Sequence, residues 1–388
     1  MNWMRMRRIS VSFLLLLLLT GCWDQAELPE KGFVMGLAID ENEKGKFLLT
    51  AQIFKPVQAV GGKGNQMSYL HIKGEDYSIA KAIRDIPSRL GRKMQWSHLR
   101  VVIISEALAR DKGLSDLMEF FYRDHEPRII APVMITQGRA SDVLRRKPLI
   151  ENTLSQQLFE GQRASAAHNA KTLDMNLLLL GKMTRSEVGN SMIPYVFQSE
   201  IDGTPVLNIE GAALLKKGTM TGRLDGEKME GVQMLLNKYG SGMVKIPCGR
   251  GEDPMKNESV EVLSLHSGMK PDFSRRPPVI RYAVKVQAAI VELTCSRKAE
   301  TEDEAKAFAD RAGMVIKRKL EGATGYLKKI KFDALGLGNV LYRKDPSLWK
   351  QWKPEWDDIF AETSFQFDVE VTLRSSGTNV GHSALHTK

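Results

Sequence analysis

The sequence of 388 residues is poor in the residues that build metal and redox sites. It has 3 cysteines and 7 histidines, with no Cys-x-x-Cys and no His-Glu-x-x-His spacing. A Gly-x-Ser-x-Gly elbow, a P-loop, a dinucleotide-binding fingerprint and an EF-hand loop are also missing. These absences remove the common sequence signatures of hydrolases, kinases and dehydrogenases, and they predict a protein that is not an enzyme and has neither metal nor cofactor.

Long apolar runs are missing after the first 21 residues. The longest candidate lies in LDMNLLLLGKM and stops at Gly181, short of the roughly 20 residues that cross a bilayer. At the front, RMRRISVSFLLLLLLTGC places Arg5, Arg7 and Arg8 before an apolar core from residue 9 to residue 19. This core is too short to span a membrane, but it fits the apolar region of an export signal.

The four residues that end this segment are more specific. Leu19, Thr20, Gly21 and Cys22 resemble the lipobox of bacterial lipoproteins, where small residues precede a cysteine that carries a diacylglyceryl group. Cleavage before Cys22 would remove residues 1–21 as a signal peptide. Acyl chains then anchor the protein, because each buried CH₂ contributes roughly 0.8 kcal/mol. We predict an exported chain held at the membrane by lipid on Cys22; a plain secretory signal with an incidental cysteine is the alternative.

The charge balance is basic. Lys and Arg total 56 against 46 Asp and Glu, a formal charge of +10, and losing three arginines with the signal leaves 10 − 3 = +7. A basic chain can bind nucleic acid, but attraction to anionic headgroups suits a lipid-anchored chain better, and an ordinary solvated surface explains the value best. We predict no nucleic-acid partner. An exported protein can form disulfides, but one possible pair, Cys248 with Cys295, leaves the pairing open.

The first half alternates strands and helices, which predicts an α/β layer with some parallel pairing. Proline and turn residues in SMIPYVFQSEIDGTPVLN then mark a boundary, so that residues 22–200 form an N-terminal α/β domain. The expected strands are 33–40, 46–54, 99–106 and 128–138, and the expected helices are 77–90, 113–124, 140–146 and most of 151–186.

The second half, residues 201–377, predicts an α+β domain, which makes the whole chain a multi-domain, mixed α/β protein of mixed sheets packed with helices. A hairpin over 209–226 precedes a helix that Gly240 closes. The segment around Pro247 and Cys248 reads as a loop, and the tail 378–388 as loose chain. The remaining expected elements are strands 258–271, 279–293 and 364–373 and a long helix 300–333.

Two features of this half are candidates for chemistry. Glu292 shares the apolar parity of its strand, so it is either a buried acid or, more simply, a paired edge glutamate. Three tryptophans and a phenylalanine follow at spacings of three, four and four, which puts them on one helical face, although Pro354 favours two short turns. Core packing explains this stripe better than a sugar-stacking platform; its members are Trp349, Trp352, Trp356 and Phe360.

Taken together, these segments resemble the Ger(x)C family of spore germination lipoproteins. The resemblance begins at the lipobox and continues through GLAID, HLRVVIISEALA and RDHEPR, and it resumes at GAALLKKGTMTGRLDGEKMEG. It is most specific in DALGLGNVLYRKDPSLWKQWKPEW, and the tail after Gly377 is not part of the pattern. The residues that follow the family pattern are Asp333, Leu335, Gly336, Gly338, Trp349, Trp356 and Phe360.

The resemblance implies a non-enzymatic function. Members are the C subunits of germinant receptors at the outer face of the spore inner membrane, beside polytopic A and B subunits. Together these subunits respond to nutrients and trigger germination, and the nutrient pocket belongs to a membrane subunit. Two other functions stay open on the residues alone: a lipid-anchored solute-binding protein, which titration with amino acids and sugars would reveal, and a wall hydrolase that uses Glu292.

Overall fold

The computed structural model describes residues 31–54, 69–124, 126–248, 256–295 and 301–375, together with positions 3 and 7. The expected lipidation site Cys22, the expected tail 378–388 and the rest of the expected signal lie outside these residues. Within the described ranges, no helix is long and apolar enough to cross a membrane.

A mixed sheet dominates the first part of the chain. Its strand order is β3-β2-β1-β5-β6-β7-β8-β9, with β4 paired to β1. The four central strands β1, β5, β6 and β7 run parallel to one another, whereas the pairs at both sides are antiparallel. The strands are β1 Lys31–Glu41, β2 Phe47–Phe54, β3 Tyr69–Asp76, β4 Lys93–Gln95, β5 Val101–Ser105, β6 Val133–Thr136, β7 Asn190–Ile201, β8 Thr204–Lys216 and β9 Thr219–Leu224.

Strand β5 is the most apolar strand because it lies at the centre of this sheet. All five residues of β5, VVIIS, are buried, as expected for a parallel strand that is covered on both faces.

The expected helix 77–90 is two helices because Asp85 ends the first, and Pro87 is accommodated in the first turn of the second. The helices around the sheet are α2 Ile79–Arg84, α3 Ile86–Leu90, α4 Glu106–Asp111, α5 Ser115–Arg123, α6 Ala140–Leu144, α7 Leu154–His168 and α8 Leu177–Thr184, with a 3-10 turn at Trp96–His98.

The sheet continues through the segment in which the sequence predicts a domain boundary. Strand β7 pairs with β8 from Asn190–Lys216 to Ile201–Thr204, so residue 200 lies next to the turn of a long hairpin. Pro194 is accommodated because the register shifts between Pro194 and Val196. The prolines and turn residues of this segment therefore belong to two paired strands and the turn between them, and β8 and β9 complete the first sheet.

The second sheet has the order β10-β11-β12-β13 and is also mixed, because β12 and β13 run parallel. Its strands are β10 Gly242–Pro247, β11 Asn257–Asp272, β12 Val279–Glu292 and β13 Ser364–Ser375. Alternate residues of β12 are buried from Ile280 to Ala288, which confirms the period-two face expected there. Together with the first sheet, this confirms the mixed α/β fold class.

Helix α10 (Glu302–Lys329) covers the apolar face of the second sheet. A capping box between Thr301 and Glu304 begins the helix, and Phe308, Leu320 and Leu327 lie on its buried side. The helix α9 (Gly226–Leu235) packs against it but ends earlier than expected. Asn237, with φ +57°, takes the left-handed position after α9 that the sequence assigned to Gly240.

The structure pairs Cys248 with Cys295, which settles the question that the sequence left open. The two Cα atoms lie 5.8 Å apart, after the ends of β10 and β12. The segment around Pro247 is strand β10 rather than the expected loop, because Val244 and Ile246 bury their side chains beside β11.

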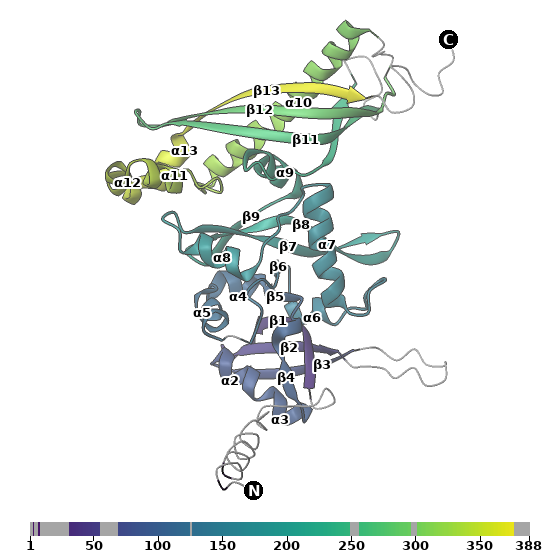
Figure 1. Ribbon diagram of the computed structural model, residues 1–388, viewed down its shortest axis with the longest axis vertical. Helices are drawn as coiled ribbons and strands as arrows, with labels where there is room; N and C mark the ends of the chain where they lie inside the picture. The colour runs from purple at the N-terminus through teal and green to yellow at the C-terminus, as the bar shows by residue number, and fades with distance from the viewer. Residues whose placement is uncertain are drawn as a thin grey trace.

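Figure 1 shows an elongated molecule with β1, β2 and β3 at one end and the second sheet at the other. Helix α9 lies between the two sheets, and the short helices before β13 lie at one side of the second sheet. These are α11 Leu337–Lys344, α12 Pro346–Trp352, a 3-10 turn Lys353–Glu355 and α13 Trp356–Glu362.

Candidate functional site

Most of the family-pattern residues gather around a buried carboxylate. Asp333 follows α10 and is 2% exposed. Its carboxylate accepts hydrogen bonds from the backbone N–H of Leu337 (3.0 Å) and Gly338 (2.9 Å) and from the indole N–H of Trp356 (3.1 Å). Burial raises the pKa of Asp333. The N–H donors act in the opposite direction and lower this pKa, because they stabilise the anion at the start of α11. The side chain therefore fixes the start of one helix to a ring from another.

Backbone geometry and close packing explain why positions 336 and 338 of the family pattern are glycine. Gly336 has φ +70°, the left-handed region that favours glycine, and it caps α11. A Cβ on Gly338 would lie 2.6 Å from Cγ2 of Val188 and 2.8 Å from the ring of Trp349. Glycine at 338 therefore allows α11 to approach both neighbours.

The aromatic stripe is packed inside the protein. Trp349 is 2% exposed, Trp356 4% and Phe360 0%. The rings of Trp349 and Trp356 meet edge to face at 5.3 Å, and Phe360 lies edge to face with Phe365 of β13 at 6.2 Å. Two short helices carry them, as Pro354 indicated, and burial leaves no open ring face for a sugar.

Residues of the first half complete this cluster. The carboxylate of Glu187 accepts hydrogen bonds from the indole of Trp349 (3.0 Å) and from Lys353 (2.7 Å), and these donors lower its pKa. The amide of Asn190 donates to the backbone oxygen of Asp333 (3.3 Å). We call this cluster the Asp333 junction; it comprises Glu187, Val188, Asn190, Asp333, Gly336, Gly338, Asn339, Trp349 and Trp356.

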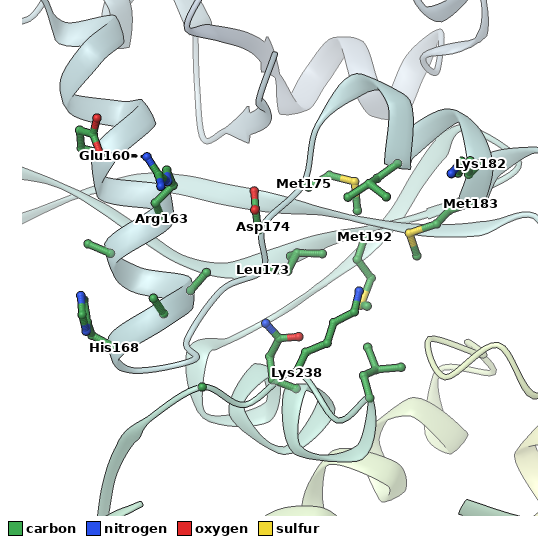
Figure 2. Close-up of a pocket in the computed structure, with 17 residues that line it drawn as sticks. Glu160, Arg163, His168, Leu173, Asp174, Met175, Lys182, Met183, Met192 and Lys238 are labelled. Atoms are coloured by element: carbon green, nitrogen blue, oxygen red, sulfur yellow. Dashed lines mark ion pairs between the residues drawn. The ribbon is translucent and has the colours of Figure 1, made fainter. Parts of the chain in front are cut away.

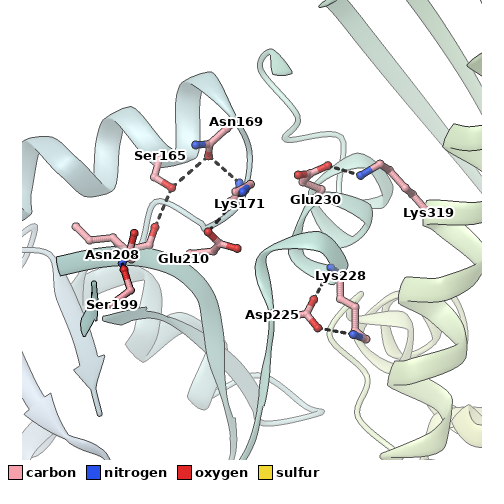
Figure 3. A network of polar contacts seen from close by, with 11 residues as sticks. Ser165, Asn169, Lys171, Ser199, Asn208, Glu210, Asp225, Lys228, Glu230 and Lys319 are labelled. Carbon is pink, nitrogen blue, oxygen red and sulfur yellow. Dashed lines mark hydrogen bonds and ion pairs between the residues drawn. The ribbon is translucent and has the colours of Figure 1, made fainter. Parts of the chain in front are cut away.

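Further polar contacts join the first sheet to the helices of the second sheet around the junction. Val188 donates its N–H to Asn339 (3.2 Å), and Lys216 of β8 contacts Asp357 of α13 at 2.6 Å. Figure 3 shows the contacts around α9, where Glu230 pairs with Lys319 of α10 at 2.7 Å. The Glu230 and Lys319 side chains are only 10% and 17% exposed, so solvent screens this pair less than it screens a surface pair.

A cleft of 880 Å³ lies between α7, α8 and α9 (Figure 2). Leu173, Met175 and Met192 form its apolar floor, and charged side chains surround the rim. Glu160 pairs with Arg163 on one side at 3.8 Å, and Lys238 extends across the floor toward Met192. The cleft combines an apolar floor with a charged rim, and sequence reasoning did not find it.

The carboxylate considered for hydrolysis is not buried. Glu292 is exposed at the end of β12 and accepts a hydrogen bond from Ser259 Oγ at 2.7 Å. The expectation of a buried acid is therefore wrong. The alternative, an edge glutamate paired with a basic residue, is not what the structure shows either, because β12 lies between β11 and β13 and the bond is to a serine. In the part of the chain that the structure describes, no three His, Cys, Asp or Glu residues group as metal ligands.

Two family models match the chain, one over each of the two regions that meet at the Asp333 junction. The model for "Spore germination protein N-terminal domain" covers residues 24–198, and that for "Spore germination B3/ GerAC like, C-terminal" covers residues 210–377. The chain belongs to the Ger(x)C family of spore germination proteins. Within this family assignment, Glu187 and Asn190 come from the first matched region and Asp333 to Trp356 from the second.

Relatives of the Ger(x)C family match over nearly the full length. Spore germination protein B3 of Bacillus subtilis (strain 168) is 23% identical over 380 residues, covering 96% of this chain and 98% of that protein. Spore germination protein KC of the same organism is 22% identical over 395 residues, covering 96% of each. The crystal structure of the GerBC protein is similar with a TM-score of 0.55 and 21% identity, covering 90% of this chain and 99% of that one, which shows a shared fold.

Proposed function

We propose that this chain is a non-enzymatic, lipid-anchored C subunit of a spore germinant receptor. It assembles with polytopic A and B subunits at the outer face of the spore inner membrane, and together they respond to nutrients and trigger germination. The observation that carries the proposal is the pair of family matches, which run in order along residues 24–198 and 210–377.

The Asp333 junction supports a role in assembly rather than in chemistry. Its one buried carboxylate is occupied by three N–H donors, and its aromatic rings are packed against one another. Such a cluster holds surfaces in fixed relative positions, which a receptor subunit needs in order to pass on a signal. The family-pattern residues therefore stabilise the arrangement of the two halves and do not contact nutrient.

The position of the anchor sets the orientation that we propose. Residues 23–30 between Cys22 and β1 extend at most about 28 Å, at 3.3–3.6 Å per residue. The first sheet would then lie next to the bilayer and to the outer loops of the A and B subunits, with the second sheet further out (Figure 1). Confinement by lipid raises the effective concentration of these partners, so weak contacts suffice.

Substitution of the anchor tests this function. We expect Cys22→Ala to leave the amino terminus unmodified, to release the chain from spore membranes in high salt, and to reduce the germination response to nutrients. Mass spectrometry of the amino terminus, membrane fractionation and the nutrient-induced fall in optical density measure these effects. Ser12→Ala, which keeps the lipobox, is the control. An unmodified Cys22→Ala chain that stays with the membrane and supports normal germination would contradict the proposal.

A further inference from the structure

Strand β13 forms an open edge of the second sheet. It runs for 12 residues and, within the described part of the chain, pairs only with β12. Its outer side therefore presents backbone N–H and C=O groups that can pair with another strand. Figure 1 shows β13 at the end of the molecule opposite β1, β2 and β3.

A groove follows this edge. It has a volume of 970 Å³ and lies between residues 367–373 of β13 and one face of α10. Small residues of α10 at spacings of four, Ala305, Ala309 and Gly313, leave the space for it. The side chains of Phe367, Val369, Val371 and Leu373 are only half-buried and provide apolar surface along the groove.

The groove is acidic although the protein is basic. The charged residues that line it are Glu302, Lys306, Asp310, Lys317, Asp368 and Glu370, four acids against two bases, a net charge of 2 − 4 = −2. The whole chain carries +10. Lys285 of β12 stands opposite Glu370 in the strand register, whereas Asp368 stands opposite Ala283. The edge therefore favours a partner that brings positive charge.

We propose that this groove binds an extended, lysine-rich segment of a partner protein, which adds to the sheet as a fifth strand beside β13. An open strand edge next to a helix is a known geometry for strand addition, in which backbone hydrogen bonds provide affinity and alternate side chains provide specificity. Alternate apolar residues of the segment contact Val369 and Val371, and the basic residues between them approach Asp368 and Glu370. The inference rests on the second sheet alone, not on the lipid anchor or the receptor assignment.

A second copy of β13 is a poorer occupant. Antiparallel pairing of two β13 strands about Val369 would place Asp368 of one copy beside Glu370 of the other, and like charges at paired positions destabilise a sheet. The charge of the groove therefore selects a different, basic strand.

A synthetic strand tests the groove directly. The probe is a fluorescein-labelled ten-residue peptide with lysine at alternate positions and valine or threonine between them, and the matched control peptide has glutamate in place of lysine. We expect the full chain carrying Cys22→Ala to bind the lysine peptide at least ten-fold more tightly by fluorescence anisotropy. Hydrogen exchange at amides 367–373 should slow when the lysine peptide binds.

Two helix variants separate the groove from the rest of the surface. Ala305→Phe fills the groove and should weaken lysine-peptide binding at least ten-fold, whereas Ala307→Phe, at an exposed position outside the groove lining, should not. If Ala305→Phe lowers the melting temperature, the double variant Asp368→Lys, Glu370→Lys replaces it and should reverse the peptide preference. Equal binding by all variants, or unchanged exchange along β13, would overturn the proposal.

Discussion

Trp356→Ala should lower the free energy of unfolding by about 3–5 kcal/mol, the usual cost of truncating a buried aromatic side chain. The indole is 4% exposed and packs edge to face on Trp349, so its removal leaves a cavity. It also removes one of the N–H donors to the buried Asp333 carboxylate. Because a domain is typically stable by only 5–15 kcal/mol, we expect the amount of folded protein in spores to fall as well.

A conservative variant separates the loss of ring packing from the loss of the hydrogen bond to Asp333. Trp356→Phe keeps most of the ring but loses the N–H, so we expect an intermediate loss of about 1–3 kcal/mol, the cost of a buried acceptor that loses a donor. Urea denaturation followed by circular dichroism measures all three proteins. If Trp356→Ala unfolded like the unsubstituted chain but abolished germination, the ring would contact a partner instead of the core.

Gly338→Ala should destabilise the Asp333 junction by about 1–3 kcal/mol, the range seen when a methyl group is forced into a packed core. The new Cβ would lie 2.6 Å from Val188 and 2.8 Å from the Trp349 ring, closer than real Cβ contacts. Relief requires α11 to move away from the loop before β7, which weakens the hydrogen bond between Val188 and Asn339.

A second glycine provides the matched control for this substitution. Gly322 lies inside α10 with nothing within 4 Å of a built Cβ, so Gly322→Ala should stabilise the protein by about 0.5–1 kcal/mol. Thermal unfolding of the two variants should therefore shift in opposite directions. Shifts of the same sign would show that the close approach at Gly338 is not what holds the junction.

The sequence predicted those elements that a residue pattern within the element itself produces. The period-two alternation in β12 and the acidic start of α10 are visible in the sequence because one element alone produces each of them. The spacing of the aromatic stripe likewise indicated burial, although the structure distributes its members over two short helices rather than one helical face. The resemblance to the Ger(x)C family drew attention to Asp333 but provided no physical role for it.

The features that sequence reasoning missed depend on contacts between distant segments. Glu187 and Trp349 are 162 residues apart, and no local pattern shows that they share a hydrogen bond. Strand β7 was missed because Pro194 and the turn residues near 202 resemble a linker when the neighbouring strand β8 is not known. Strand β10 was missed for a similar reason, since its partner β11 and the pairing of Cys248 with Cys295 define it.

Purification of the chain from spore membranes tests the central proposal most directly. An affinity tag after residue 388, mild detergent and quantitative mass spectrometry would identify the proteins that remain bound. The proposal predicts that two polytopic membrane proteins of the receptor co-purify in constant ratio to this chain, and that Trp356→Ala reduces their recovery together with the amount of folded chain. Recovery of folded chain without either polytopic subunit would contradict it.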